Sequence, residues 1–428
     1  MTFEIFMLFA LMGICFMMRI PISFSLMLPA IFYFILTGQN LNQFAAIITG
    51  SMFSNYVILA APLFIFAANV MNSGQVTAQI FKFANGLLGR FKGGTALVNV
   101  FASLIFSGMT GSAIADAAGL GILEIEQMKK EKYDDGFTCA ITAASATIGP
   151  IFPPSLPFIV YSMLSGASVG ALFLGGIIPG VLLAGALMVY VAFVSHKKHL
   201  PIGENYPAKQ FLKYTIRAVP ALLTPVILLW GIYGGMVTPT EAGALAALYT
   251  IIISILIYRS LNAKVLWEII KKTASTTAVL GLMIAGSMIF SYIIALERFP
   301  NAVAEIILGI TANKYIFLLI VNLVFIILGA FMDTATIQLV FIPIILPLVK
   351  YFGINLVHFG VVINLNIMIG LSTPPFGLLL FITSAIAKTQ LKDTIREILP
   401  IIVVMIVVLF FITFVPGLVL LIPNLSAN

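Results

Sequence analysis

Two proline pairs interrupt apolar stretches at equivalent places in the two halves of this sequence. The first pair lies in GPIFPPS (149–155) and the second in GLSTPPF (370–376), and the pairs are 221 residues apart. The same offset aligns a glycine in each of two polar segments, SGMTGS (107–112) and GAFMDT (329–334). Because proline removes a backbone donor and breaks a helix, the repeat predicts two related halves, each with a polar segment followed by a broken helix.

The segments around these breaks have the composition of a membrane protein. Apolar residues make up 61% of the chain and charged residues 9%, and the mean hydropathy is +1.14, so there is more apolar surface than a soluble domain can bury. The apolar runs are as long as membrane helices, which predicts an all-α polytopic membrane protein. The formal charge of +7 sits in loops between these runs, so we attribute it to membrane topology and expect no nucleic-acid partner.

Two segments are predicted to be re-entrant hairpins, which enter and leave the lipid bilayer on the same face. They are 94–128 and 314–349, each with a polar centre between apolar arms that we judge too short for two crossings. We expect membrane spans near 3–18, 21–37, 57–72, 137–165, 169–196, 217–236, 241–258, 275–296, 357–387 and 398–422.

The distribution of basic residues supports this path through the membrane. Among the 22 Lys and Arg residues, all except Arg298, Lys314 and Lys350 fall on one side. Basic residues favour the cytoplasmic side, so we predict that both termini are periplasmic. The first hairpin then opens from the cytoplasm and the second from outside, which makes the two halves an inverted repeat.

Two amphipathic segments, 75–92 and 261–274, carry basic residues opposite an apolar face. We interpret them as arm helices that connect a fixed part of the protein to a moving part, and ordinary loop helices at the membrane surface are the alternative. The predicted order is scaffold helices (1–74), the first arm (75–92), a first transport half (93–196) with its broken helix at 137–165, scaffold helices (197–260), the second arm (261–274), a second transport half (275–397) with its broken helix at 357–387, and a C-terminal span (398–428).

The breaks also predict the binding sites. A helix broken inside a membrane frees carbonyl oxygens that suit a small hard cation such as Na⁺, and N–H groups that suit an anionic substrate group. The first cation site is predicted at Ser103, Ser107, Gly108, Ser145, Thr147, Gly149 and Pro150, and the second at Gly329, Met332, Asp333, Thr336, Gly370, Ser372, Thr373 and Pro374. A carboxylate substrate is predicted between them, at Ser107, Thr110, Gly111, Ser112, Asp116, Pro154, Ser155, Thr334 and Pro375.

Asp116 and Asp333 are the two acids near the hairpin tips. Ionisable residues inside a membrane are costly and indicate function, although either acid could instead cap a helix. For Asp333 we favour structural support or electrostatic help at the cation site, and for Asp116 the alternatives stay open. As the paired acids of an intramembrane aspartyl protease they would have to converge on one water, but the repeat aligns Asp333 with Ser112 rather than with Asp116.

The sequence offers no nucleotide site. The segment GRFKGGT (89–95) lacks the spacing of a phosphate-binding loop, and no other segment has it. We therefore expect an ion gradient as the energy source, no nucleotide cofactor and no enzymatic activity.

Four segments together resemble the large membrane subunit of tripartite ATP-independent periplasmic (TRAP) transporters, the DctM type. They are SGMTGSAIAD (107–116), GPIFPPS (149–155), TPTEAG (238–243) and STPPFG (372–377). Within that family the chain is most similar to the sialic-acid branch. The resemblance covers nearly the whole chain.

The resemblance implies an ion-transporter-superfamily fold, in which a scaffold carries an elevator-type transport domain that contains both hairpins. It implies Na⁺-coupled import, with two or more ions, of an organic acid delivered by a periplasmic substrate-binding protein across the bacterial inner membrane. It also implies a small four-helix membrane subunit, which we expect to be a separate chain because this sequence begins at its first span. A stand-alone Na⁺/dicarboxylate symporter of the same superfamily is the alternative.

Overall fold

The protein is all-helical in the computed structural model, which describes residues 3–54, 56–72, 75–204 and 206–426. Seven of its helices are long and apolar enough to cross a membrane, which confirms the expected fold class. They are α11 (Val169–Lys197), α12 (Ala208–Tyr233), α13 (Pro239–Leu256), α14 (Ala263–Leu296), α16 (Lys314–Phe331), α17 (Thr334–Tyr351) and α20 (Leu391–Phe414). The termini that we predict to be periplasmic, residues 1–2 and 427–428, lie outside the described residues.

Each half of the repeat contains a hairpin and a broken helix. The first half has α6 (Gly94–Thr110), α7 (Ala113–Ala118) and α8 (Leu120–Lys130), followed by α9 (Asp135–Ala146) and α10 (Leu156–Ser165). The second half has α16 and α17, followed by α18 (Leu356–Leu371) and α19 (Leu378–Ala387). Both proline pairs lie in the breaks, and the Pro153–Pro154 and Pro374–Pro375 bonds are cis.

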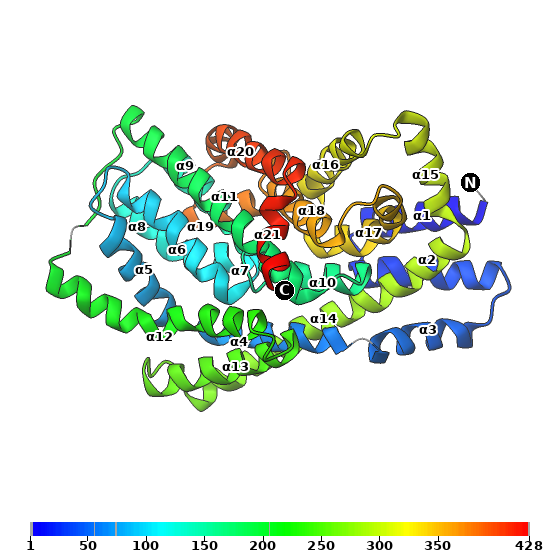
Figure 1. Cartoon of the computed structure of the whole chain (residues 1–428), viewed down its shortest axis with the longest axis horizontal. Coiled ribbons are helices and arrows are strands. Elements are labelled where there is room, and N and C mark those ends of the chain that lie inside the picture. Colours follow the sequence, from blue (N-terminus) through cyan, green and yellow to red (C-terminus); the bar gives the residue numbers. More distant parts are fainter. Residues whose placement is uncertain (1–2, 55, 73–74, 205, 427–428) are drawn as a thin grey trace.

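The two halves interlock through their broken helices. In each half the segment before the break packs on its own hairpin, α9 on α6 and α18 on α16. The segment after the break crosses to the other half, so that α10 packs on α17 and α19 packs on α7 (Figure 1). This exchange brings the two hairpin tips into the same region of the molecule.

The arms of the second hairpin are longer than we expect from the sequence. Both α16 and α17 have 18 residues, and each is long and apolar enough to cross a membrane. The expectation that these arms are too short to cross is therefore wrong. The re-entrant path of this hairpin stays a prediction, and its half-buried tip residue Asp333 faces the first half across the cavity described below.

A second layer is formed by helices from both ends of the predicted scaffold. It contains α1 (Phe3–Met17), α2 (Ile22–Leu36), α3 (Leu41–Ser54) and α4 (Ala60–Met71), together with α12 to α14. Helix α14 packs on α2, α3 and α4, while α13 packs on α4 and α12, so these helices run below the two interlocked halves in Figure 1. Helix α5 (Gln75–Leu88) follows α4 and places its apolar face, with Val76 and Ile80, against α6 and α12.

Several helix boundaries differ from the prediction. One continuous helix, α14, replaces the separate arm (261–274) and span (275–296), because the segment contains no proline and no left-handed residue that would stop it. Helix α3 and α15 (Phe299–Ile310) occupy segments to which we assigned no helix. The expected span at 398–422 is divided into α20 and α21 (Gly417–Ser426), since Pro416 lies between them.

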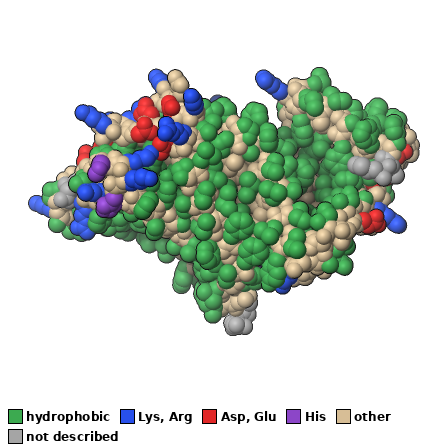
Figure 2. Space-filling view, turned by 90° about the horizontal axis from the view of Figure 1, so that it is seen from above, with side chains coloured by type: hydrophobic (Ala, Val, Ile, Leu, Met, Phe, Trp, Pro, Cys, Tyr) green, Lys and Arg blue, Asp and Glu red, His purple; other side chains and the backbone are tan. Residues whose placement is uncertain are grey.

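Charged side chains gather at one end of the molecule (Figure 2). Lys129, at the end of α8, forms an ion pair with Asp135 at 3.1 Å and donates a hydrogen bond of 2.5 Å to the carbonyl oxygen of Ala387. Lys198, after α11, is 2.5 Å from Glu397 of α20. The contact of Lys129 joins the end of the first hairpin to α19, and that of Lys198 joins the end of α11 to α20. The assignment of this end to the cytoplasm stays a prediction.

Candidate functional site

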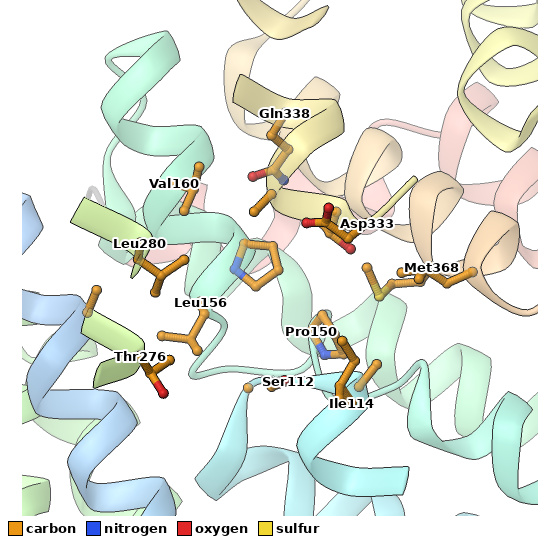
Figure 3. A pocket seen from close by; sticks show the side chains of 17 residues that line it. Ser112, Ile114, Pro150, Leu156, Val160, Thr276, Leu280, Asp333, Gln338 and Met368 are labelled. Atoms are coloured by element: carbon orange, nitrogen blue, oxygen red, sulfur yellow. The ribbon is translucent and has the colours of Figure 1, made fainter. Parts of the chain in front are cut away.

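A cavity of about 270 Å³ lies between the two hairpin tips. Residues of both tips line it, including Ser112 and Ile114 from the first and Asp333 from the second, and Pro150 of the first break lies between them (Figure 3). Helices α18 and α14 complete the wall, with Met368 from the former and Thr276 and Leu280 from the latter. The fold thus brings both tips, one break and the second layer of helices around a single cavity.

The first tip is held against the first break by backbone contacts. Gly111 has a φ of +60°, and a side chain there would meet the carbonyl oxygen of Pro154, so only glycine fits without strain. The carbonyl oxygen of Gly111 accepts a hydrogen bond of 3.3 Å from the amide of Leu156. Ser155 caps α10 and donates a hydrogen bond of 2.5 Å to Pro150 O. The tip and the break therefore form one rigid unit.

The second tip is held against the second break in a related way. Gly329 of α16 lies against Gly370 of α18, and a Cβ atom at Gly370 would be 2.6 Å from the Cα atom of Gly329. The amide of Gly377 donates a hydrogen bond of 3.3 Å to the carbonyl oxygen of Ala330. Gly377 is the counterpart of Leu156 in the repeat, so each tip is joined to its break through equivalent break residues.

Asp116 is buried between the first tip and the first break. One of its carboxylate oxygens accepts a hydrogen bond from Thr110, whereas Oδ2 is buried without a hydrogen-bond partner in the described part of the chain. Oδ2 lies against Gly149, where a Cβ atom would collide with it. Ser112, not Asp116, caps α7. An unpaired buried carboxylate oxygen is costly, and an oxygen atom is the kind of ligand that Na⁺ takes, but Na⁺ at the first predicted cation site stays a prediction.

Asp333 is the N-cap of α17. Its carboxylate accepts hydrogen bonds from both the amide and the hydroxyl of Thr336, the amide bond being 3.2 Å long. The capping alternative is therefore correct, and it leaves Asp333 on the cavity wall, half-buried (Figure 3). The charge near the helix N-terminus is stabilised by the helix dipole while it remains within reach of the cavity.

The predicted residues differ in where they lie. Gly111, Ser112, Pro150, Asp333 and Thr334 line the cavity. Five predicted hydroxyl groups donate hydrogen bonds to neighbouring oxygen atoms of the protein, those of Ser107, Ser145, Thr147, Ser372 and Thr373. Only the lone pairs of their oxygen atoms are then left for an ion. Met332 and Thr336 line a second cavity on the other side of Asp333. Pro375 is exposed, and Ser103, Gly108, Thr110, Asp116, Gly149, Pro154, Ser155, Gly329 and Gly370 are buried behind the walls.

Two functional candidates are absent from the sequence-based list. Gln338 of α17 is fully buried, lines the cavity, and donates a hydrogen bond of 2.9 Å to Asn364, while its Oε1 atom has no partner among the described residues. Glu124 of α8 is 1% exposed and lies close enough to Asp116 for the two carboxylates to interact. A polar residue within a mostly apolar helix is the signal that could have found Gln338, whereas α8 carries several charged residues and offers no such signal for Glu124.

Several known proteins are similar to this chain in sequence. The family model described as "Tripartite ATP-independent periplasmic transporter, DctM component" matches residues 6–418. The chain is 40% identical over 405 residues to the sialic acid TRAP transporter large permease protein SiaM of Vibrio cholerae, with 95% of each chain covered. It is 35% identical over 370 residues to the C4-dicarboxylate TRAP transporter large permease protein DctM of Pseudomonas aeruginosa, covering 86% of this chain and 87% of that one.

A solved structure is similar as well. The YdaH transporter of Alcanivorax borkumensis superposes on this chain with a TM-score of 0.62, covering 88% of this chain and 89% of that one. The two sequences are only 14% identical, so the similarity concerns the fold alone. The chain is thus a multi-pass membrane transporter subunit rather than an enzyme. The resemblance inferred from the sequence is confirmed: the chain belongs to the DctM family of tripartite ATP-independent periplasmic transporters.

Proposed function

We propose that this chain is the large membrane subunit of a Na⁺-coupled importer of an organic acid in a bacterial inner membrane, with both termini in the periplasm. The acid is delivered by a periplasmic substrate-binding protein, and a small four-helix membrane subunit completes the complex. Sialic acid is the favoured substrate, because the SiaM relative shares 40% of its residues with this chain over nearly the full length. The 35% identity to a C4-dicarboxylate permease makes a dicarboxylate the second candidate.

The observation that carries the proposal is the cavity between the two hairpin tips. Its walls are mostly apolar and carry a few hydroxyls and the Asp333 carboxylate, and the unpaired Oδ2 atom of Asp116 lies behind the first tip, against Gly149. A cation at Asp116 would neutralise the buried carboxylate behind the first tip, and this would couple cation binding to substrate binding in the cavity that the tip lines.

The way in which the halves interlock supports an elevator mechanism. Because α10 packs on α17 and α19 packs on α7, neither hairpin can move far without the other. We propose that the two hairpins and the two broken helices move as one transport domain against the layer formed by α1 to α4 and α12 to α14. Helix α5 and the first turns of α14 then act as the arms between the two parts.

Uptake into proteoliposomes tests the coupling ion and the partners together. With both membrane subunits, substrate-loaded binding protein and an inward Na⁺ gradient, we expect uptake of sialic acid. Replacing Na⁺ by K⁺ is expected to lower the rate by about tenfold or more, the usual size of strong coupling between sites. Undiminished uptake in K⁺ would contradict Na⁺ coupling.

Omission of the binding protein separates the two transport hypotheses. Uptake is expected to stop without it, whereas a stand-alone Na⁺/dicarboxylate symporter would continue to take up free acid. Competition by unlabelled sialic acid or succinate then identifies the substrate class. Asp116 and Asp333 do not line one common cavity, so the structure gives no support to the aspartyl protease alternative.

A further inference from the structure

A second cavity lies on the far side of Asp333 from the central one. It is open, has a volume of about 440 Å³, and runs between the junction of α1 with α2 and the second hairpin tip. Arg19 and Pro21 come from the junction, while Met332, Asp333 and Thr336 come from the tip. Asp333 lines both cavities, so the two cavities lie on opposite sides of one residue.

Among the residues that the structure describes, none that lines the central cavity has a cationic side chain for an organic acid. The polar side chains that line it are Ser112, Thr276, Asp333, Thr334 and Gln338. The Asp333 carboxylate repels a second carboxylate, and the unpaired Oε1 atom of Gln338 is an acceptor that an anion cannot use. Arg19 is the one basic residue among the described residues that line either cavity.

The position of Arg19 is fixed by the backbone around it. After α1 ends, Arg19 takes a φ of 59°, and the amides of Arg19 and Ile20 donate hydrogen bonds of 3.0 Å to Phe16 O and Cys15 O, respectively. The Ser25 hydroxyl then donates a 3.0 Å hydrogen bond to the Ile20 carbonyl oxygen. Arg19 is exposed, and it forms no ion pair with any residue that the structure describes. Its guanidinium is therefore available to a ligand.

We propose that Arg19 and the second hairpin tip form an anion site that binds the carboxylate of the transported acid next to Asp333. A guanidinium presents two parallel N–H donors that match a carboxylate, and its positive charge offsets the repulsion from Asp333 at the point where the acid passes. With the predicted topology this junction is cytoplasmic, so the site lies on the release path. The inference rests on the proposed function, since it takes the transported acid as the anion.

Binding to the purified complex of the two membrane subunits tests the site without the binding protein. Dissociation constants are measured in Na⁺ for sialic acid and for succinate, and for their uncharged esters, the methyl ester and the dimethyl ester, respectively. The proteins compared are wild type, Arg19→Gln, Arg19→Lys and Arg259→Gln. Arg259 is a matched control, because it is exposed, has a φ of 51° and lines neither cavity.

Arg19→Gln is expected to weaken binding of the acid about tenfold and to leave the ester unchanged, the loss of one charge-assisted contact being of that size. Arg19→Lys keeps the charge and is expected to retain most of the preference for the acid, and Arg259→Gln is expected to behave as wild type.

An unchanged acid-to-ester ratio in folded Arg19→Gln, as judged by its thermal unfolding, would overturn the anion site while leaving the proposed function intact. Arg19→Lys keeps the comparison possible if the glutamine variant does not fold, since complete loss of the preference in the lysine variant would also contradict a charge-based site. Failure of wild type to bind either acid in Na⁺ would overturn the anion site, while the proposed function would be judged separately by the uptake assay with the binding protein.

Discussion

Gly370→Ala is expected to destabilise the protein by about 1–3 kcal/mol, the usual cost of overpacking a close contact, and to abolish uptake. The new Cβ atom would be 2.6 Å from the Cα atom of Gly329 and 2.7 Å from the carbonyl oxygen of Ile326. Both neighbours are backbone atoms, so no side-chain rotation can relieve the clash. The second tip would have to move away from the second break. Thermal unfolding of the purified complex, followed by the uptake assay, measures both effects.

Gly185→Ala is the matched control for this prediction. Gly185 lies inside α11, and nothing approaches within 4 Å of the position that its Cβ atom would occupy. Alanine is the better helix former by about 1 kcal/mol, so we expect unchanged uptake and equal or slightly higher stability. Wild-type stability in Gly370→Ala would contradict the glycine contact between α16 and α18.

Asp333→Asn is expected to raise the Na⁺ concentration for half-maximal uptake about tenfold, as loss of a single charge–ion contact would do. Asparagine caps a helix about as well as aspartate, so the variant removes the charge and keeps the hydrogen bond with Thr336 N–H. Asp333→Ala removes both, and we expect a further loss of about 1 kcal/mol in stability. The Na⁺ dependence of initial uptake rates and the unfolding temperature separate the two contributions.

Asp134→Asn controls for capping alone. Asp134 caps α9 in the same way, with its Oδ1 atom accepting a hydrogen bond of 2.8 Å from the amide of Phe137, and it lines neither the central nor the second cavity. We expect this variant to keep the Na⁺ dependence of wild type. If Asp333→Asn does so as well, Asp333 serves α17 only as a cap and takes no part in Na⁺ binding.

Most of the candidate site could be predicted because its signals are local. Proline lacks a backbone donor wherever it lies, so Pro150 and the two proline pairs mark the breaks without any knowledge of the fold. Gly111 tolerates its φ of +60° for an equally local reason. The position of Asp333 before α17 also identifies it as a possible cap, and the structure agrees.

The residues that were missed depend on how helices are rotated and paired. Gln338 is one polar residue in an apolar helix, and only the packing of α10 on α17 turns it toward the cavity. From the sequence, Arg19 is an ordinary basic residue in a loop. Only the packing of the α1–α2 junction near the second tip places it on the wall of the second cavity. The amphipathic stretch 261–274 and the apolar stretch 275–296 differ in composition, which predicts two separate helices. No residue between them ends a helix, so they form the single helix α14.

By itself, the sequence determined that the chain is a helical membrane protein, that it consists of two related halves, and where each half is broken. Those properties follow from total hydrophobicity and from the chemistry of proline and glycine, which act wherever these residues lie. The packing of the helices, by contrast, brings the two tips to one cavity, leaves an unpaired oxygen on Asp116, and places Arg19 and Asp333 on the wall of the same second cavity. These facts depend on contacts between segments far apart in the chain, because α10 and α19 each cross to the opposite half.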